Sequence, residues 1–361
     1  PHFAGHRAVL HRAMASAASA NPRNCTIFYC VLLGRDRLAY AHDKPPVVVV
    51  GGVAGELVAG EGQATAEDAK SLAVQGAWLR LAEMEQKDTQ WGQVVRRMKE
   101  ETRAWCVKAA IRVLPDATNR RRWGWSQGEE LKCRCGAVAT DAHILSACPN
   151  ALQRYGWRHA GVLRSIEEAC VQAAGAGWKV YLDLQTTREG RPEPHSQAWL
   201  AAHGVATKLR PDMLLLKTKE NGEIDRVIVL ELSCPWEAET EDAWARETDE
   251  WAVKAKAAGW SWKNTVERRR AAKRFKYSAM LMNELPQEWR AELLTVEIGT
   301  RGLVGKETKQ DVHNLFRMLG RNKDAKQQAE KCIAEARRRA LLPHAQPAVV
   351  LAHGAAPPPV P

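Results

Sequence analysis

The stretch LRPDMLLLKTKENGEIDRVIVLELSCPWE, residues 209–237, decides the fold that we expect for this chain. Two apolar runs flank Asn221-Gly222, a dipeptide that is typical of the turn of a β-hairpin. The sequence therefore predicts two neighbouring strands joined by a loop of more than two residues. One acid belongs to each apolar run, with Asp212 at the start of the first run and Glu231 inside the second.

These two acids stand out because an ionised carboxylate inside an apolar strand costs free energy unless it is paired or binds a cation. Pairing of the strands can bring Asp212 and Glu231 together, and a divalent metal ion would remove the repulsion between them. Hard oxygen ligands suit Mg²⁺ or Mn²⁺, which can polarise a phosphodiester and activate water. The alternative is that Asp212 caps a turn and Glu231 lies on a solvated face of the sheet. The alternation of apolar residues leaves both interpretations open.

A basic stretch, ERRRAAKRFKYSAM at residues 267–280, is expected to lie on a helix. Lys273 and Lys276 are three residues apart and therefore share a helix face. A lysine beside a scissile phosphate can hold the attacking water or offset developing charge. Three neighbouring arginines can grip a nucleic-acid backbone: Arg268, Arg269 and Arg270. A solvated basic helix and a nuclear-import patch remain the alternatives.

The segment CRCGAVATDAHILSAC contains a pattern of metal-ligand type, C-x-C-x7-H-x4-C, formed by Cys133, Cys135, His143 and Cys148. Three cysteines and a histidine are a standard ligand set for zinc, and Gly136 suits a tight turn that brings backbone close to a metal. Four protein ligands leave no open coordination position, so the sequence predicts a structural zinc site. The alternative is three buried cysteines beside an incidental histidine.

The composition favours a polyanionic partner. The chain has 361 residues, with 53 Lys and Arg against 42 Asp and Glu, a formal net charge of +11. Nucleic acid is the first candidate and an acidic membrane surface the second, and the alternative is a basic surface without a specific partner. A membrane-spanning segment is not expected, because no stretch approaches about 18 apolar residues. Scattered cysteines and the lack of a secretory signal indicate an intracellular, reducing compartment. The first residue is Pro1, which indicates a fragment or a processed product.

We expect six segments along the chain, from composition and hydrophobic periodicity. They are a poorly ordered stretch with one candidate strand at 47–50 (1–64), a helical region (65–125), a zinc knuckle (126–150), an α/β domain (151–321), a C-terminal helix (322–342) and a disordered Pro/Ala-rich tail (343–361). Within them, we expect helices at 66–86, 91–114, 151–176, 238–258, 263–284 and 307–341, the last as one helix or two. Besides the hairpin, strands are expected at 178–184 and 293–300.

Taken together, these stretches resemble the C-terminal region of non-LTR retrotransposon proteins that carry a restriction-like endonuclease. The resemblance covers residues 105–320. It rests on an ordered series of segments: AIRVLPDATNRRRWG, the Cys/His pattern, RYGWRHAGVLRSI (154–166), RPD, VLELSCPWE, Lys-x-x-Lys-Tyr (273–277) and VEIGTRGLVG (296–305). The resemblance implies an α/β fold with a restriction-endonuclease-like mixed sheet flanked by helices, preceded by a helical region and a small zinc knuckle.

The resemblance also implies roles for individual residues. Asp212 and Glu231 would bind the catalytic Mg²⁺ or Mn²⁺. Lys276 as first choice, or Lys273, would be the lysine that this family moves from the strand to a helix, since Ser233 stands where a Glu-x-Lys signature has lysine. Three residues outside the basic helix are candidates for contact with DNA: Arg210, Arg158 and His159. For His159, a core or capping role remains the alternative.

The function implied is a metal-dependent endonuclease that nicks target DNA in the nucleus. DNA is the expected partner, and the RNA of the element is a second candidate. The reverse transcriptase is expected elsewhere on the parent polypeptide, because this chain contains no Tyr-x-Asp-Asp motif. Two alternatives remain open. One is a catalytically inactive nucleic-acid-binding remnant, and the other is a structural protein whose basic charge is incidental.

Overall fold

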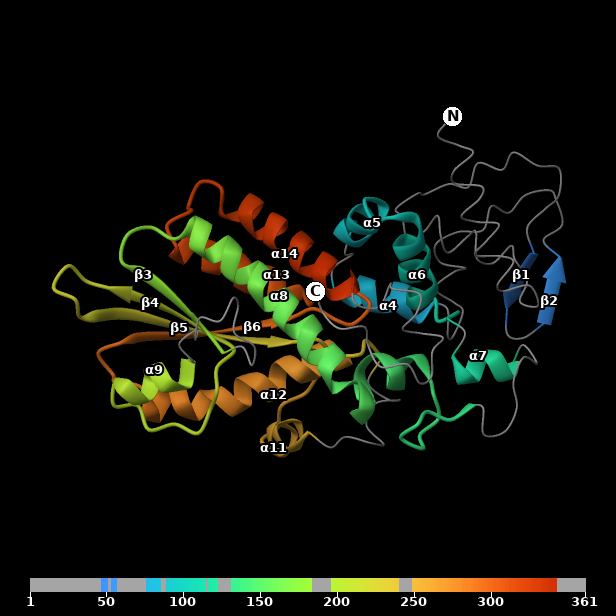
Figure 1. The fold of residues 1–361 in the computed structure, drawn as a ribbon, viewed down its shortest axis with the longest axis horizontal. Helices are drawn as coiled ribbons and strands as arrows, with labels where there is room; N and C mark the ends of the chain where they lie inside the picture. The colour runs from blue at the N-terminus through green and yellow to red at the C-terminus, as the bar shows by residue number, and fades with distance from the viewer. Residues whose placement is uncertain are drawn as a thin grey trace. The chain divides into compact units, whose positions relative to one another are not determined.

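The computed structural model of the protein describes residues 47–50, 53–56, 76–85, 89–114, 116–122, 131–183, 196–239 and 249–342 (Figure 1). The expected disorder of the remainder of 1–64 and of the tail lies outside these residues. The chain divides into two compact units, one comprising the chain up to Tyr155 together with that from Leu341 onward, and the other comprising Gly156–Ala340.

The first unit is mainly helical in its described part. The strand expected at 47–50 is confirmed as β1 (Val47–Val50), which pairs antiparallel with β2 (Val53–Glu56). Four helices follow: α4 (Ala77–Met84), α5 (Thr89–Arg96), α6 (Glu100–Ala110) and α7 (Ala117–Arg122). Tryptophans supply much of its core, and the rings of Trp78 and Trp91 lie 5.5 Å apart.

The prediction of a single helix at 91–114 is wrong in one respect, because the helical conformation is interrupted between α5 and α6. Lys99 is extended, with ψ of 152°, and precedes the first residue of α6. Met98 and Trp105, on either side of Lys99, are seven residues apart, which is about two helical turns, so periodicity alone does not reveal the interruption. The helix also ends at Ala110, before Pro115. Arg112 then takes a positive φ of 55°.

The second unit is built on a four-stranded mixed sheet with strand order β3-β4-β5-β6. The strands are β3 (Trp178–Leu182), β4 (Met213–Thr218), β5 (Ile224–Ser233) and β6 (Arg290–Glu297). β3, β4 and β5 are antiparallel neighbours, and β6 runs parallel to β5. The predicted hairpin is confirmed. Its loop spans residues 219–223, where Gly222 has a φ of 85° and the amide of Lys219 donates to the carbonyl of Glu223.

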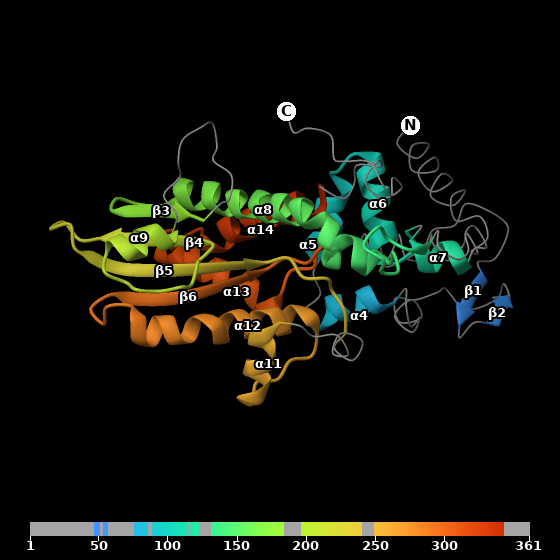
Figure 2. The same ribbon diagram turned by 60° about the horizontal axis from the view of Figure 1, so that its bottom comes forward.

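Helices cover both faces of this sheet (Figures 1 and 2). One face packs against α8 (Leu152–Ala173), α13 (Lys306–Met318) and α14 (Ala325–Leu341). The other packs against α9 (Ser196–Ala202) and α12 (Thr265–Ala279). A strand buried on both faces reads as a continuous apolar run, which explains the sequence VIVLEL in β5.

The coarse fold prediction, a mixed α/β domain with helices around its sheet, is confirmed. The helix expected at 263–284 is α12, extended by a π-helical turn (Met280–Glu284). Of the helix expected at 238–258, the structure shows α11 (Glu250–Ala257), whereas the expected start is wrong, because Glu239 forms an isolated β-bridge with Asn264. The region 307–341 forms two helices, with Gly320 at a φ of 96° between them.

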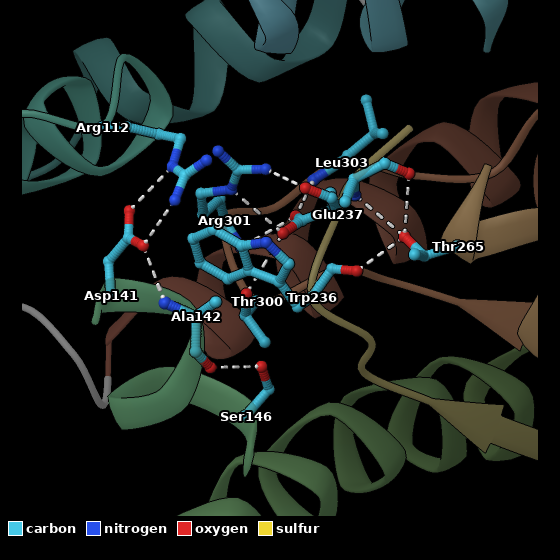
Figure 3. A network of polar contacts seen from close by, with 11 residues as sticks. Arg112, Asp141, Ala142, Ser146, Trp236, Glu237, Thr265, Thr300, Arg301 and Leu303 are labelled. Atoms are coloured by element: carbon cyan, nitrogen blue, oxygen red, sulfur yellow. Dashed lines mark hydrogen bonds and ion pairs between the residues drawn. The ribbon is translucent and has the colours of Figure 1, made fainter. Parts of the chain in front are cut away.

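A buried ion pair between Glu237 and Arg301 holds the chain just beyond β5 (Figure 3). The Glu237 carboxylate accepts the backbone amides of Arg301 (2.8 Å) and Leu303 (3.2 Å) and the hydroxyl of Thr300 (3.1 Å). The guanidinium lies 4.1 Å from the centre of the Trp236 ring. These contacts fix the end of β5 to the loop that follows β6.

The first residue of α12 is tied to the same segment. Thr265 donates its hydroxyl to the carbonyl of Trp236 at 2.6 Å and accepts the amide of Ala238 at 2.9 Å. Its own amide donates to the carbonyl of Ala238 at 3.0 Å. The start of α12 is therefore positioned relative to β5 by hydrogen bonds between neighbouring segments.

Replacement of Gly299 tests how tightly this clamp is packed. A Cβ at Gly299 would collide with the Glu237 carboxylate, so Gly299→Ala is expected to destabilise the protein by about 2–4 kcal/mol. The control is Gly161→Ala in α8, where the nearest atom would be 4.0 Å away. This change is expected to stabilise by about 0.5–1 kcal/mol, because alanine favours a helix. Urea unfolding measures both values, and a neutral Gly299→Ala variant would contradict the clamp.

Candidate functional site

Asp212 and Glu231 meet at one end of the sheet. Met213 lies opposite Leu230 in the β4–β5 ladder, so the same register places Asp212 opposite Glu231. The amide of Asp212 donates to Oε1 of Glu231 at 3.1 Å, and the amide of Leu232 donates to Oδ2 of Asp212 at 2.7 Å. Glu231 is 1% exposed, so the alternative that it lies on a solvated face is wrong.

Lys273 of α12 supplies the cation nearest to these acids. Asn264 begins the helix by accepting the amides of Val266 and Glu267, and Lys273 follows two turns later. Its Nζ lies 2.5 Å from Oε2 of Glu231 and 3.9 Å from Oδ2 of Asp212. Three elements thus bring two carboxylates and an ammonium together.

Lys276 is not placed as the sequence analysis preferred. Its Nζ lies 3.4 Å from the hydroxyl of Tyr277 and packs 4.7 Å from the centre of that ring. Lys273 and Tyr277, four residues apart on α12, bond to Glu231 and to the carbonyl of Arg210, whereas the ammonium of Lys276 contacts the phenol of Tyr277. The structure therefore favours Lys273 over Lys276 as the lysine beside the acids.

Tyr277 and Asp183 belong to this arrangement and were missed by sequence reasoning. Tyr277 is fully buried and donates its hydroxyl to the carbonyl of Arg210 at 2.8 Å, just before Asp212. Asp183 follows β3, and its amide donates to the carbonyl of Asp212 at 2.9 Å. The sequence contained a signal for Tyr277, because it lies four residues after Lys273, one helical turn away. For Asp183, only the pairing of β3 with β4 reveals that it lies close to Asp212.

The environment drives the pKa values of the two acids apart. Burial raises the pKa of Glu231, and the charge of Asp212 raises it further, against the opposing charge of Lys273. Burial also opposes ionisation of Asp212, but hydrogen bonding to His159 and the charge of Lys273 outweigh it and lower its pKa. For Lys273, the two carboxylates outweigh burial and raise its pKa. Asp212 and Lys273 are therefore charged at neutral pH.

His159 approaches the same acids from α8. Its Nε2 lies 3.5 Å from Oδ2 of Asp212, and its side chain is 29% exposed. Burial lowers the pKa of the imidazole, but the hydrogen bond and charge of Asp212 outweigh this and raise it. The structure therefore gives His159 an acidic partner within the protein.

The structure does not support three of the arginines as contacts to a nucleic-acid backbone. Arg158, Arg268 and Arg270 are only 2%, 8% and 6% exposed. Arg270 lies on the same helix face as Lys273 and forms ion pairs with Glu297 and Asp311. A helix turns by about 100° per residue, so three consecutive arginines cannot all face solvent.

Arg210 and Arg269 are the predicted arginines that reach the surface. The guanidinium of Arg210 makes two hydrogen bonds of 2.9 Å to the carboxylate of Asp183, with its side chain 51% exposed. Arg269 pairs with Asp249, which also begins α11 by accepting the amide of Trp251. Both guanidinium groups are held in place by an acid and remain partly exposed.

A second cluster lies in the first unit and has the chemistry of a metal centre. One ligand atom from each of Cys133, Cys135, His143 and Cys148 lies within 4.8 Å of the others. Sγ of Cys133 and Cys148 are 3.5 Å apart, and Sγ of Cys135 is 3.1 Å from Nε2 of His143. Tetrahedral zinc with sulfur at about 2.3 Å sets two sulfurs about 3.8 Å apart. The cluster can therefore hold a metal ion such as zinc.

The local fold brings these four residues together in two pieces. Cys133 and Cys135 lie in a tight turn, where Gly136 has a φ of 85° and the amide of Cys133 donates to the carbonyl of Ala137. His143 begins a π-helical turn (His143–Ala147), and Cys148 follows it. Both local predictions, the glycine turn and the helical turn, are confirmed.

The thiols differ in their readiness to ionise. Burial raises the pKa of Cys133, but hydrogen bonds from the amide and thiol of Cys135 and from Cys148 outweigh it and lower the value. Burial and the interaction with Cys133 raise the pKa of Cys148 to about 11. Burial lowers the pKa of His143, which favours the neutral imidazole that a metal needs.

No protein-family model matches this chain, and a comparison with curated proteins finds no match either. Within the described part of the chain, none of the helices combines the length and apolar character that crossing a bilayer requires.

Lys273→Met is expected to destabilise the protein by about 3–5 kcal/mol at pH 8, because it leaves a buried carboxylate without its cation. Loss of this charge raises the pKa of Glu231 further. A carboxyl with a raised folded-state pKa binds its proton more readily when folded, so acidification stabilises the folded state relative to the unfolded one. The difference from wild type should therefore shrink as the pH falls from 8 towards 5. Urea unfolding across this range measures it.

The matched control is Lys276→Met. Its ammonium contacts Tyr277, and burial and the charge of Lys273 lower its pKa, so the change should cost less than about 1 kcal/mol. An equal loss of unfolding free energy in the two variants would contradict the contacts of Lys273 and Lys276 given above. A loss for Lys273→Met that does not depend on pH would contradict its pairing with Glu231.

Proposed function

We propose that the second unit is a metal-dependent DNA endonuclease domain of the restriction-like kind, derived from a non-LTR retrotransposon. One observation carries the proposal: Asp212 and Glu231 converge from neighbouring strands of a buried sheet and share the ammonium of Lys273. The resemblance of RPD, VLELSCPWE and Lys-x-x-Lys-Tyr to that family supports the same interpretation.

Asp212 and Glu231 are the residues that would hold Mg²⁺ or Mn²⁺. Their oxygens are hard ligands, and the ammonium of Lys273 already lies between them as a cation. The side chain of Asp212 is 17% exposed, so the pair can be reached from solvent. When bound, such an ion would polarise the phosphodiester and activate water for its hydrolysis.

The chain's own residues would orient the reaction. The amide of Leu232 and Nε2 of His159 hold Oδ2 of Asp212, which fixes this carboxylate at the edge of the sheet. The ammonium of Lys273 can offset charge that develops on the phosphate. Arg210, held by Asp183, and Arg269, held by Asp249, are the proposed contacts to the DNA backbone.

The Cys/His cluster is proposed to bind one structural zinc ion. All four ligands come from the protein, which leaves no coordination position for substrate. Its role would therefore be to fold the segment 131–151. By the same resemblance, the protein would act in the nucleus on target DNA, with element RNA as a second candidate partner and the reverse transcriptase on the parent polypeptide.

A second candidate function is a nucleic-acid-binding remnant without catalytic activity. The observation that favours it is the direct ion pair between Lys273 and Glu231, since a metal ion is not needed to neutralise this carboxylate. Metal binding would have to displace the ammonium from Glu231. The two candidates therefore differ in whether a divalent ion can compete with Lys273.

Nicking of supercoiled plasmid in Mg²⁺ or Mn²⁺ tests the enzyme. Wild type is expected to convert the plasmid to open circles, and Asp212→Asn should lower the rate by about two orders of magnitude while salt-sensitive DNA binding persists. The control is Asp225→Asn, which removes an acid paired with Arg290 at the other end of β5 and should leave the rate unchanged.

Other outcomes of this assay decide between the candidates. DNA binding by a wild type that does not cut would favour the remnant. Cutting that persists in Asp212→Asn would overturn the proposed catalytic site, and the absence of salt-sensitive binding would favour a protein whose basic charge is incidental.

Metal analysis tests the zinc proposal separately. One zinc ion per chain is expected in the purified protein. Cys135→Ser should lose it, whereas Cys234→Ser, outside the cluster, should retain it. Chelation should raise amide exchange in residues 131–151, because the ligands hold this segment together. Full occupancy in Cys135→Ser would exclude Cys135 as a ligand.

A further inference from the structure

One hydroxyl group ties together the two backbone positions that carry His143 and Cys148. The hydroxyl of Tyr155 accepts the amide of Cys148 at 2.9 Å. The same hydroxyl donates to the carbonyls of Ile144 (2.9 Å) and His143 (3.1 Å). Both ends of the π-helical turn are therefore fixed by the same oxygen atom.

A carboxylate holds the start of this turn. Oδ1 of Asp141 accepts the amide of Ala142 at 2.8 Å, next to His143 (Figure 3). The guanidinium of Arg112 makes hydrogen bonds of 3.2 and 3.3 Å to the same carboxylate. Asp141 is 2% exposed, so this pair is shielded from solvent on the side of the acid.

The carboxylate is itself part of a buried network that reaches back to the end of α6. The amide of Asp141 donates to Asp116 at 2.8 Å, and Asp116 also accepts the amide of Asn119 at 2.8 Å. The side chain of Asn119 donates to the carbonyls of Arg112 (2.8 Å) and Leu114 (2.7 Å). The network stabilises the positive φ of Arg112, a conformation that costs a non-glycine residue about 1 kcal/mol or more.

We propose that Tyr155 and Asp141 are positioning residues of the metal site, an inference that rests on the proposed zinc ion. Both residues act here through hydrogen bonds to backbone groups of the segment 142–148. Tyr155 holds the backbone of His143 and Cys148, and Asp141 holds the amide of Ala142 next to His143, so that Nε2 of His143 and Sγ of Cys148 are presented to the same point. Groups that orient the ligands of a metal typically change its affinity by 10–100-fold when removed.

The network also makes residues 112–114 and 116–119 part of the metal-binding unit. The amide of Ala117 donates to the carbonyl of Ala139 at 2.9 Å, in addition to the contacts of Asp116 and Asn119. Metal binding is therefore expected to be coupled to the order of these residues, which precede Cys133, the first ligand of the cluster, in sequence.

Tyr155→Phe is the sharpest test, because it removes one oxygen and leaves the ring. The full-length protein is titrated with Co²⁺, which reports thiolate ligands and tetrahedral geometry by absorbance, and Zn²⁺ affinity is then measured by displacement. Tyr155→Phe is expected to lower the Zn²⁺ affinity by about 10–100-fold. The control is Tyr181→Phe in β3, a tyrosine whose ring lies 5.7 Å from that of Trp199 in a tilted arrangement, and this variant should bind as wild type does.

A graded pair of variants tests the carboxylate. Asp141→Asn keeps an oxygen for the amide of Ala142 but loses the charge opposite Arg112, whereas Asp141→Ala loses both. We expect the affinity to fall in the order wild type, Asn, Ala. Circular dichroism of the metal-loaded proteins checks that each variant is folded, and a variant that does not fold is replaced in the comparison by the milder member of the pair.

The outcomes separate this inference from the zinc proposal. Tight Co²⁺ and Zn²⁺ binding by wild type, with equal affinity in Tyr155→Phe and both Asp141 variants, would overturn the positioning roles and leave the zinc site intact. A wild type that shows no thiolate-to-cobalt absorbance would overturn the zinc site itself, and the positioning roles with it.

Discussion

The ion pair between Lys273 and Glu231 is the interaction on which the second unit depends. Glu231 is buried in an inner strand of a sheet that is covered on both faces, where an ionised carboxylate without a partner costs several kcal/mol. The ammonium comes from a helix that packs on this face of the sheet and places Lys273 next to Glu231. The packing of α12 on β5, and the contacts that fix the start of that helix, follow from this requirement.

The same arrangement explains why charged groups gather at one end of the sheet. Asp212 directly precedes β4 and Asp183 directly follows β3. The register of the three antiparallel strands brings these strand ends together with the end of β5 that carries Glu231. Tyr277 and His159 then hold the segment from opposite faces through Arg210 and Asp212. Each charge has a partner of opposite sign, which allows a polar cluster to persist beside an apolar core.

The two clusters of this protein differ in the kind of cation that they suit. The first unit offers sulfur and imidazole ligands in a closed set, typical of a structural ion. The second unit offers two carboxylates and keeps one of them partly exposed, which suits a hard ion that exchanges with solvent. The Cys/His cluster can therefore hold a metal ion, and the hard-ion site proposed for the second unit would depend on a different ligand chemistry.

Much of this protein follows from its sequence alone. Hydrophobic periodicity, Asn221-Gly222 and the Cys/His spacing determined the hairpin, most helices and the metal-ligand cluster, because each depends on contacts between residues close in the chain. Tertiary structure decided the rest. Local pattern treats the basic helix as one block, whereas packing turns Arg270 and Lys273 inward to buried acids and leaves Arg269 outside. The partners of those side chains lie on other strands and helices, so only the folded chain specifies which cation each acid receives.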